Sequence, residues 1–103
     1  MAELIYNVTT KIEHDIHAKW LQWMREKHIP AMLATGCFTK TLLLKLKSVD
    51  DADGPTYAVQ YFAANEQAYA QYLAEFATAL RTDVLNTWGN RMASFTTVLE
   101  VVN

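Results

Sequence analysis

The sequence predicts one α+β domain whose strands and helices follow the order β-α-β-β-α-β. Four stretches alternate between apolar and polar residues, the pattern of half-buried strands. Two others repeat apolar residues every three or four positions, as amphipathic helices do. The 103 residues, 51% of them hydrophobic and 19% charged, are enough for a single hydrophobic core. We therefore expect one domain over residues 1–103, without a linker or an internal repeat.

The first strand is predicted at residues 4–12, where the side chains alternate between two faces. A helix follows at residues 15–28, with polar residues on one side and large apolar residues on the other. Its apolar side is formed by Ile16, Trp20, Trp23 and Met24. Pro30 disfavours helical geometry at the preceding residue and has no N–H to donate. We therefore expect a kink, or a new short turn through residues 31–34.

Gly36 is expected to end that turn with a positive φ and to lead into a second strand at residues 37–47. One face of this strand would hold Phe38, Leu42, Leu44 and Leu46. Residues 48–55 are acidic and rich in turn formers, so they are expected to form an exposed connection. A third strand, rich in aromatic and β-branched residues, is predicted at 56–63.

Asn65 is expected to cap a second helix that begins at Glu66. The apolar residues of this helix are spaced as a stripe that faces the core: Tyr69, Leu73, Phe76, Leu80 and Val84. Gly89 is the expected stop of the helix, and residues 92–102 supply the fourth strand.

This order is the split β-α-β pattern of ferredoxin-like folds, in which a four-stranded antiparallel sheet carries two helices on one face. If the helices cover the side of Tyr6, Val8 and Leu42, the other side is a mixture of apolar and polar residues: Ile5, Asn7, Thr9, Thr39, Thr41, Leu43, Gln60, Phe62, Val98 and Val102. Such a face is too apolar for open water, and two copies packed face to face would bury it. We therefore expect a homodimer formed through the sheet faces.

Two histidines, His17 and His28, also fall on the apolar side of the first helix. Imidazole titrates near neutral pH, so an inward histidine can contact a ligand or transfer a proton in a pocket. The alternative is a histidine of the core or interface that is hydrogen-bonded to its neighbours. The helix separates the two by about 16 Å, too far for both to bind one metal ion, and we predict no metal site.

Several classes of function are disfavoured by composition. A net charge of −2 provides no basic surface for nucleic acid or an anionic membrane. No apolar run approaches the roughly 20 residues that cross a bilayer, and the first residues lack the features of a signal peptide. The single cysteine, Cys37, fits a reducing compartment. A cytoplasmic location is therefore expected.

Five runs of sequence carry a resemblance to a known family: I-Y-N-V-T at 5–9, D-I-H-x-x-W-L-x-W-M-x-x-x-H-I-P at 15–30, A-T-G-x-F at 34–38, Y-A-x-Q-Y at 57–61 and L-E-V-V at 99–102. The chain resembles, over nearly its whole length, a family of short, uncharacterised bacterial proteins described as a domain of unknown function. The resemblance implies a fold similar to the dimeric α+β barrels. That superfamily includes small monooxygenases, haem-degrading enzymes, lactone isomerases and proteins without known activity, so no reaction is implied.

The resemblance also implies a cleft between the sheet and the helices of each monomer. The candidates for its lining are His28, Trp20, Trp23, Met24, Asn7 and Tyr61, with His17 as the other inward histidine. For the tryptophans and Met24 the alternative role is core packing. For Asn7 it is a hydrogen-bonded polar residue on the dimer face.

Two functions of different kinds stay open. The first is a pocket for a small apolar or aromatic molecule, with His28 as a base or hydrogen-bond partner, no cofactor or metal, and binding favoured over catalysis. The second is a structural or regulatory dimer that recognises another protein. A haem site with His14 or His28 as axial ligand ranks third, since no motif marks either residue. Cys37 fits a small buried thiol better than a nucleophile.

Overall fold

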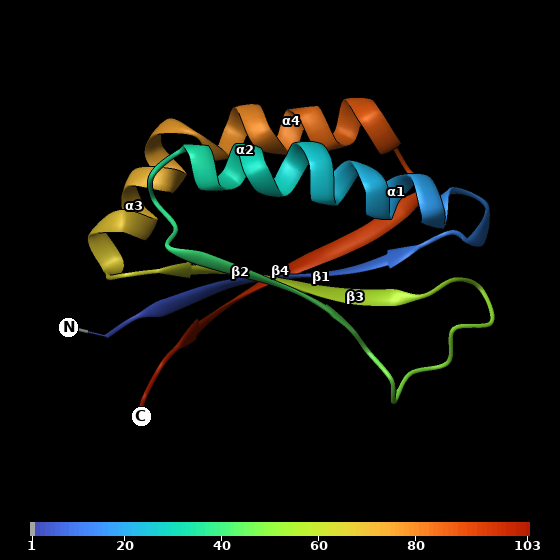
Figure 1. The fold of residues 1–103 in the computed structure, drawn as a ribbon, viewed down its shortest axis with the longest axis horizontal. Coiled ribbons are helices and arrows are strands. Elements are labelled where there is room, and N and C mark those ends of the chain that lie inside the picture. Colours follow the sequence, from blue (N-terminus) through green and yellow to red (C-terminus); the bar gives the residue numbers. More distant parts are fainter. Residues whose placement is uncertain (1) are drawn as a thin grey trace.

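The computed structural model describes residues 2–103 and contains one antiparallel sheet with the strand order β2-β3-β1-β4. The strands are β1 (Leu4–Ile12), β2 (Lys40–Lys45), β3 (Thr56–Ala63) and β4 (Met92–Glu100). All the helices lie on one face of the sheet, and the other face is bare (Figure 1). The predicted α+β fold and the order of its elements are confirmed.

The helices lie on the sheet in two rows, which we call the first and second helical layers. The first is a nearly continuous run, drawn in blue to cyan in Figure 1. A 3-10 turn, η1 (His14–Ile16), leads into α1 (His17–Trp23), a π-helical turn η2 (Met24–His28) and α2 (Ile29–Ala34). In η2 the backbone N–H of Ile29 donates to the carbonyl of Met24, five residues back. This wide turn moves aside the carbonyl that the ring of Pro30 would meet in a regular α-helix. The break expected at Pro30 is thus a widened turn, and Ile29 keeps helical dihedral angles of −60° and −45°.

The second helical layer consists of α3 (Glu66–Glu75) and α4 (Ala77–Trp88). The predicted cap is confirmed, because the Asn65 side-chain oxygen accepts a hydrogen bond of 2.9 Å from the backbone N–H of Ala68. The predicted end of the layer is also confirmed at Gly89, which has a φ of +58°.

For one residue of the apolar stripe in this layer, Leu73, the prediction that it faces the core is wrong. Leu73 is 42% exposed, whereas its neighbour Tyr72 is 1% exposed and packs in the core. The helix is interrupted at Phe76, whose φ of −127° and ψ of −27° separate α3 from α4. The stripe assumed one regular helix through both halves, and this interruption changes which residues of α3 face the sheet.

The two faces of the sheet follow the prediction in the central strands. Tyr6 and Val8 of β1 are paired with Tyr61 and Val59 of β3, and all four line the space beneath the helices. Asn7 lies between Tyr6 and Val8, so strand alternation directs it to the bare face.

In both edge strands the two faces are exchanged relative to the prediction, as a shift of one residue in the alternation would produce. In β2, Leu43 is paired with the helix-facing Val59, which turns Leu42 to the bare face. In β4, Val98 is paired with the helix-facing Tyr6, which turns Leu99 to the bare face. A shift of one residue exchanges the two faces of a strand.

The shift in β2 begins at Thr39, which is hydrogen-bonded to the neighbouring strand. Its backbone N–H and its hydroxyl both donate to the carbonyl of Phe62, at 2.7 Å and 3.2 Å. The chain bends there, so Phe38 stays in the core against Tyr6 while the strand that follows begins in the opposite phase.

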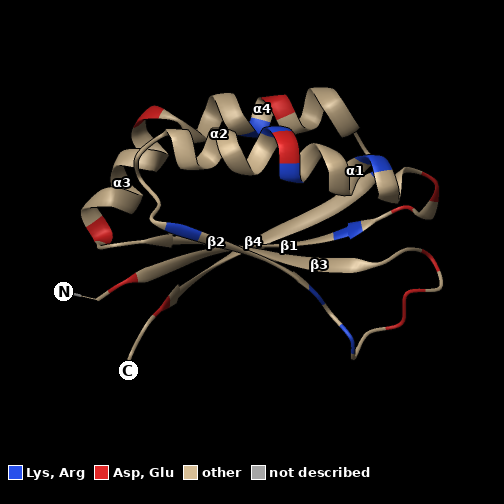
Figure 2. Ribbon diagram, viewed as in Figure 1, with Lys and Arg blue, Asp and Glu red and all other residues tan. Residues whose placement is uncertain are grey.

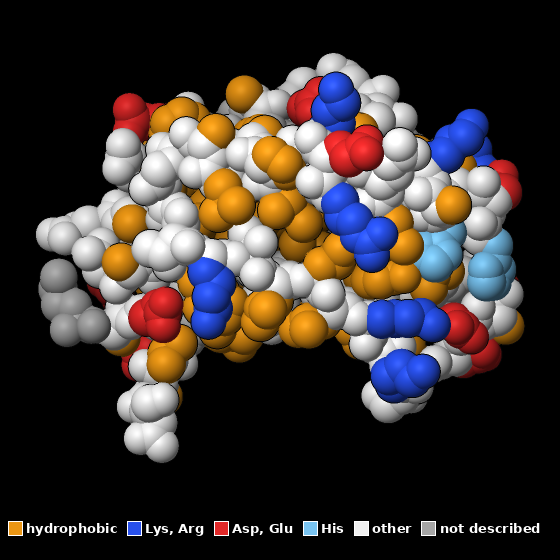
Figure 3. Space-filling model, in the orientation of Figure 1, with side chains coloured by type: hydrophobic (Ala, Val, Ile, Leu, Met, Phe, Trp, Pro, Cys, Tyr) orange, Lys and Arg blue, Asp and Glu red, His pale blue; other side chains and the backbone are white. Residues whose placement is uncertain are grey.

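Charged residues avoid the middle of every strand (Figure 2). Those within strands lie at or next to strand ends: Lys11, Lys40, Lys45 and Glu100. The bare face is correspondingly apolar, with four exposed residues on the two edge strands: Leu42, Leu44, Phe95 and Leu99. Figure 3 shows apolar side chains, in orange, gathered also between the helical layer and β2.

Candidate functional site

A cavity of about 350 Å³ lies between the helix-facing side of the sheet and the two helical layers. Its floor is formed by β1, β3 and β4, and its walls by the first helical layer, α3 and α4. The lining is mainly apolar, and its aromatic residues come from the sheet (Tyr6 and Tyr61) and from the helices (Trp20, Trp23 and Tyr72). The shape therefore suits a small molecule with an apolar body.

Most of the site residues expected from the sequence meet in this cavity: His28, Trp20, Trp23, Met24 and Tyr61. The helical ones come together because residues three, four and eight positions apart share one side of a helix. Tyr61 joins them from below, since it lies on the helix-facing side of β3. Their contact with a ligand stays a prediction.

His28 sits at the end of η2 and stacks on Trp23, with ring centroids 5.0 Å apart and planes 16° apart. Its Nδ1 is buried and has no hydrogen-bond partner within residues 2–103. Burial lowers the pKa of His28, and the carboxylate of Asp83 opposes that effect only in part. The ring is therefore neutral at pH 7, and its Nδ1 lies unpaired and closed to solvent beside the cavity.

Trp20 contributes a second nitrogen of this kind. The residue is 1% exposed and lines the cavity, and its Nε1 has no partner in the described part of the chain. An unsatisfied buried donor costs about 1–3 kcal/mol. The indole N–H is thus an unpaired donor beside the cavity, closed to solvent in this conformation.

The sequence did not point to several other polar groups of the lining. The hydroxyls of Thr10 and Ser94 lie 2.9 Å apart across β1 and β4. The Arg81 guanidinium donates to the hydroxyl of Tyr6 at 3.3 Å, and all four residues line the cavity. The one available signal was the position of Arg81 on its helix, three residues before Val84 and therefore at the border of the apolar stripe.

The phenols in this region are neutral. Burial raises the pKa of Tyr61 and of Tyr72 above the ordinary range, and neighbouring tyrosines add to the effect. They act only as neutral hydrogen-bonding groups at physiological pH.

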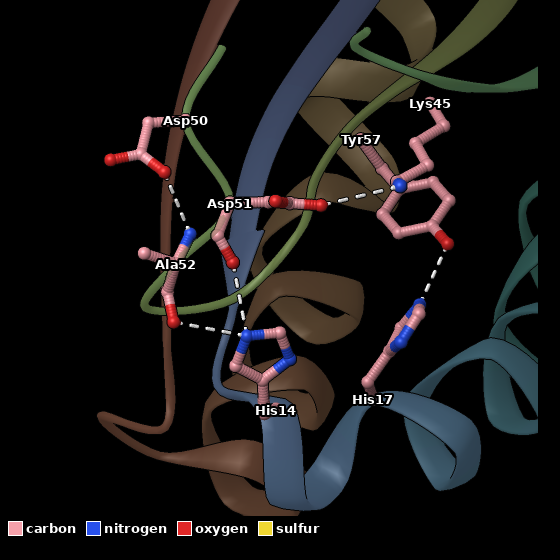
Figure 4. A network of polar contacts seen from close by, with 7 residues as sticks. All are labelled: His14, His17, Lys45, Asp50, Asp51, Ala52 and Tyr57. Atoms are coloured by element: carbon pink, nitrogen blue, oxygen red, sulfur yellow. Dashed lines mark hydrogen bonds and ion pairs between the residues drawn. The ribbon is translucent and has the colours of Figure 1, made fainter.

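His17 is not part of the cavity lining. It lies at the beginning of α1, and its Nε2 is 2.6 Å from the hydroxyl of Tyr57 on β3 (Figure 4). Burial, together with the charges of Lys45 and His14, lowers its pKa. Since α1 begins at His17, away from the middle of the helical run, this histidine fits the hydrogen-bonded role that we considered as the alternative.

His14 also holds the first helix to the rest of the fold. Its Nε2 donates to the carbonyls of Asp51 and Ala52, at 3.0 Å and 3.1 Å, in the loop between β2 and β3 (Figure 4). This nitrogen is thus engaged with backbone oxygens, which disfavours the role of axial haem ligand.

Asn7 lies on the opposite side of the sheet from the cavity, so its place in the predicted lining is corrected. Its amide nitrogen donates to Thr9 at 3.1 Å, and its oxygen accepts from Gln60 at 3.3 Å. The alternation of β1 explains the difference, because both of its neighbours in the strand face the helices. The structure therefore gives Asn7 the hydrogen-bonded role on the bare face.

Comparison with known proteins identifies the family. Residues 3–102 match the family described as "Domain of unknown function (DUF4286)". The chain belongs to this family. The resemblance noted from the sequence is thereby confirmed, and the family description gives the DUF4286 chain no function.

A solved structure shows the same fold. The crystal structure of a dimeric ferredoxin-like protein from an uncultured marine organism covers 100% of this chain and 98% of its own, with a TM-score of 0.73 and 12% sequence identity. The fold of the DUF4286 chain is therefore ferredoxin-like. No curated protein sequence matches it. Among the helices of residues 2–103, none has both the length and the apolar composition required to span a bilayer.

Proposed function

We propose that this DUF4286 protein binds a small apolar or aromatic molecule in the cavity between its sheet and its helices. The observation that carries the proposal is the mainly apolar cavity itself, whose lining includes His28 and Trp20, each with a buried nitrogen that has no partner within residues 2–103. Small-molecule sites commonly combine an apolar lining with a few polar groups of this kind. The cavity volume of about 350 Å³ also falls in the usual range.

The chemistry of His28 supports binding more than catalysis. Within residues 2–103 no hydrogen bond or ion pair connects this ring to a carboxylate or to a nucleophile. A general base is normally oriented by such a neighbour. We therefore assign His28 the role of a hydrogen-bond partner for the bound molecule.

A bulky substitution inside the cavity tests the site. We expect the neutral fluorophore N-phenyl-1-naphthylamine to bind the wild-type protein with enhanced emission. Val84→Phe should weaken that binding about tenfold or more, because the larger ring occupies the cavity that Val84 lines. Fluorescence titration gives both affinities.

Asn86→Phe provides the matched control, since Asn86 is exposed on the same helix and outside the cavity lining. It should bind the fluorophore as the wild type does. Absent binding to the wild type, or equal loss in both variants, would contradict the cavity site and favour a structural or regulatory protein-interaction role.

We also propose that two copies of the chain pack through the bare faces of their sheets. Leu42 and Leu44 are each 41% exposed on this face, and Phe95 is 63% exposed. The similar protein from the marine organism is dimeric. A two-fold axis would bring the same patch of each copy together, which is the commonest arrangement in homo-oligomers.

A charge on the bare face should disrupt this dimer. We expect the wild type to sediment as a dimer at micromolar concentration and Leu42→Lys to sediment as a monomer, because the buried lysine would lack a partner. Leu73→Lys is the control: Leu73 is 42% exposed, but on α3. A wild-type monomer, or dissociation by the control alone, would overturn the proposed interface.

A further inference from the structure

Arg81 differs from every other residue around the cavity in its charge. It is the one Lys, Arg, Asp or Glu among the described lining residues. The neutral His28 and the neutral phenols leave the lining with a single positive charge.

The other two arginines of the chain are placed differently. Arg91 pairs with the carboxylates of Glu13 and Asp15 at the beginning of β4. Arg25 is exposed on η2 and does not line the cavity. Arg81, by contrast, makes no ion pair with an acidic side chain in residues 2–103.

Arg81 is exposed on α4, and one hydrogen bond connects its guanidinium to Tyr6 in the floor of the cavity. Arg81 Nη2 donates to Tyr6 Oη, and Tyr6 itself is only 4% exposed. The phenol oxygen is the acceptor in this contact, so its own hydrogen can be donated to a second group. The guanidinium and the phenol O–H together form a donor pair suited to an anion.

We infer that the molecule bound in the cavity is an organic acid: an apolar or aromatic body with one carboxylate that pairs with Arg81 and Tyr6. This inference rests on the proposed function and specifies its ligand. The body lies among the aromatic and aliphatic lining residues. The carboxylate lies at the solvent-exposed side of the cavity, where it keeps part of its hydration, so burial of a charge is avoided.

Two probes of the same size separate the charge from the apolar body. 1-Naphthylacetate and its neutral analogue 1-naphthylacetamide are titrated into the protein by calorimetry. We expect the acid to bind about fivefold more tightly, the upper end of the effect of an exposed ion pair. Arg81→Gln should bring the ratio of the two affinities to about one, because the acid then loses its charged partner.

Arg25→Gln is the matched control, because it removes the same charge from a helix surface outside the cavity. It should preserve the preference for the acid, which excludes a general effect of net charge. If both probes bind the wild type equally, the inferred ligand class is wrong and the cavity site stands. If neither probe binds the wild type, both proposals are overturned.

Discussion

Gly54→Ala is expected to lower the free energy of unfolding by about 3 kcal/mol or more. Gly54 has a φ of +144°, a conformation that residues with a side chain rarely adopt. A β carbon at this position would lie 1.8 Å from the carbonyl oxygen of Ile12, at the end of β1. The neighbouring Pro55 carbonyl accepts a 2.9 Å hydrogen bond from the Ile12 N–H, so the loop cannot move away without losing that bond.

Gly36→Ala separates the two causes of this loss, which are the positive φ and the steric overlap with β1. Gly36 also has a positive φ, +77°, but no atom lies within 4 Å of the position that its β carbon would take. It should therefore cost about 1 kcal/mol, the conformational part alone. Urea unfolding followed by tryptophan fluorescence, at one protein concentration, measures both. Equal costs for the two variants would show that the close approach of Gly54 to β1 does not constrain the fold.

Trp20→Ala is expected to cost about 3–5 kcal/mol, as truncations of large buried aromatic residues do. Trp20 is 1% exposed, and its ring centroid lies 5.2 Å from that of Tyr57. It joins the first helical layer to β3 and forms part of the cavity wall, so the substitution removes packing on both sides.

The matched control for this truncation is Leu73→Ala, since Leu73 is 42% exposed on α3 and lies outside the cavity lining. It should change the free energy of unfolding by no more than about 0.5 kcal/mol. Thermal or urea unfolding gives the comparison. A loss below about 1 kcal/mol for Trp20→Ala would mean that this wall of the cavity is not part of the core.

The elements that the sequence predicted correctly depend on local chemistry. β3 begins and ends where the pattern of aromatic and β-branched residues does, at Thr56 and Ala63. Asn65 caps its helix through its own side chain, and Gly36 and Gly89 end theirs with positive φ. Each of these features is decided by residues that are close in sequence, so periodicity and composition are sufficient.

The errors arose where contacts between distant residues decide the structure. The phase of β2 is set by Thr39, whose two hydrogen bonds reach Phe62 on the neighbouring strand. The interruption at Phe76 has no glycine or proline to announce it. Such features depend on the tertiary fold and leave no periodic signal.

The candidate site was likewise predictable only where residues close in sequence form it. Trp20, Met24 and His28 share one side of a helix, which a helical wheel already indicates. Arg81 and Ser94 reach the cavity only because α4 and β4 fold over the same part of the sheet. The apolar wall was therefore visible in the sequence, and the polar groups required the assembled layers.

The occupancy of the cavity can be observed directly through its methionines. The chain has four, and Met24, Met32 and Met92 all line the cavity. With ¹³C-labelled methionine methyl groups, assigned by Met→Leu variants, these three signals should shift on addition of N-phenyl-1-naphthylamine and stay in place in Val84→Phe. If none of the three signals moves in the wild type at a saturating concentration of the fluorophore, the space between sheet and helices is not a ligand site.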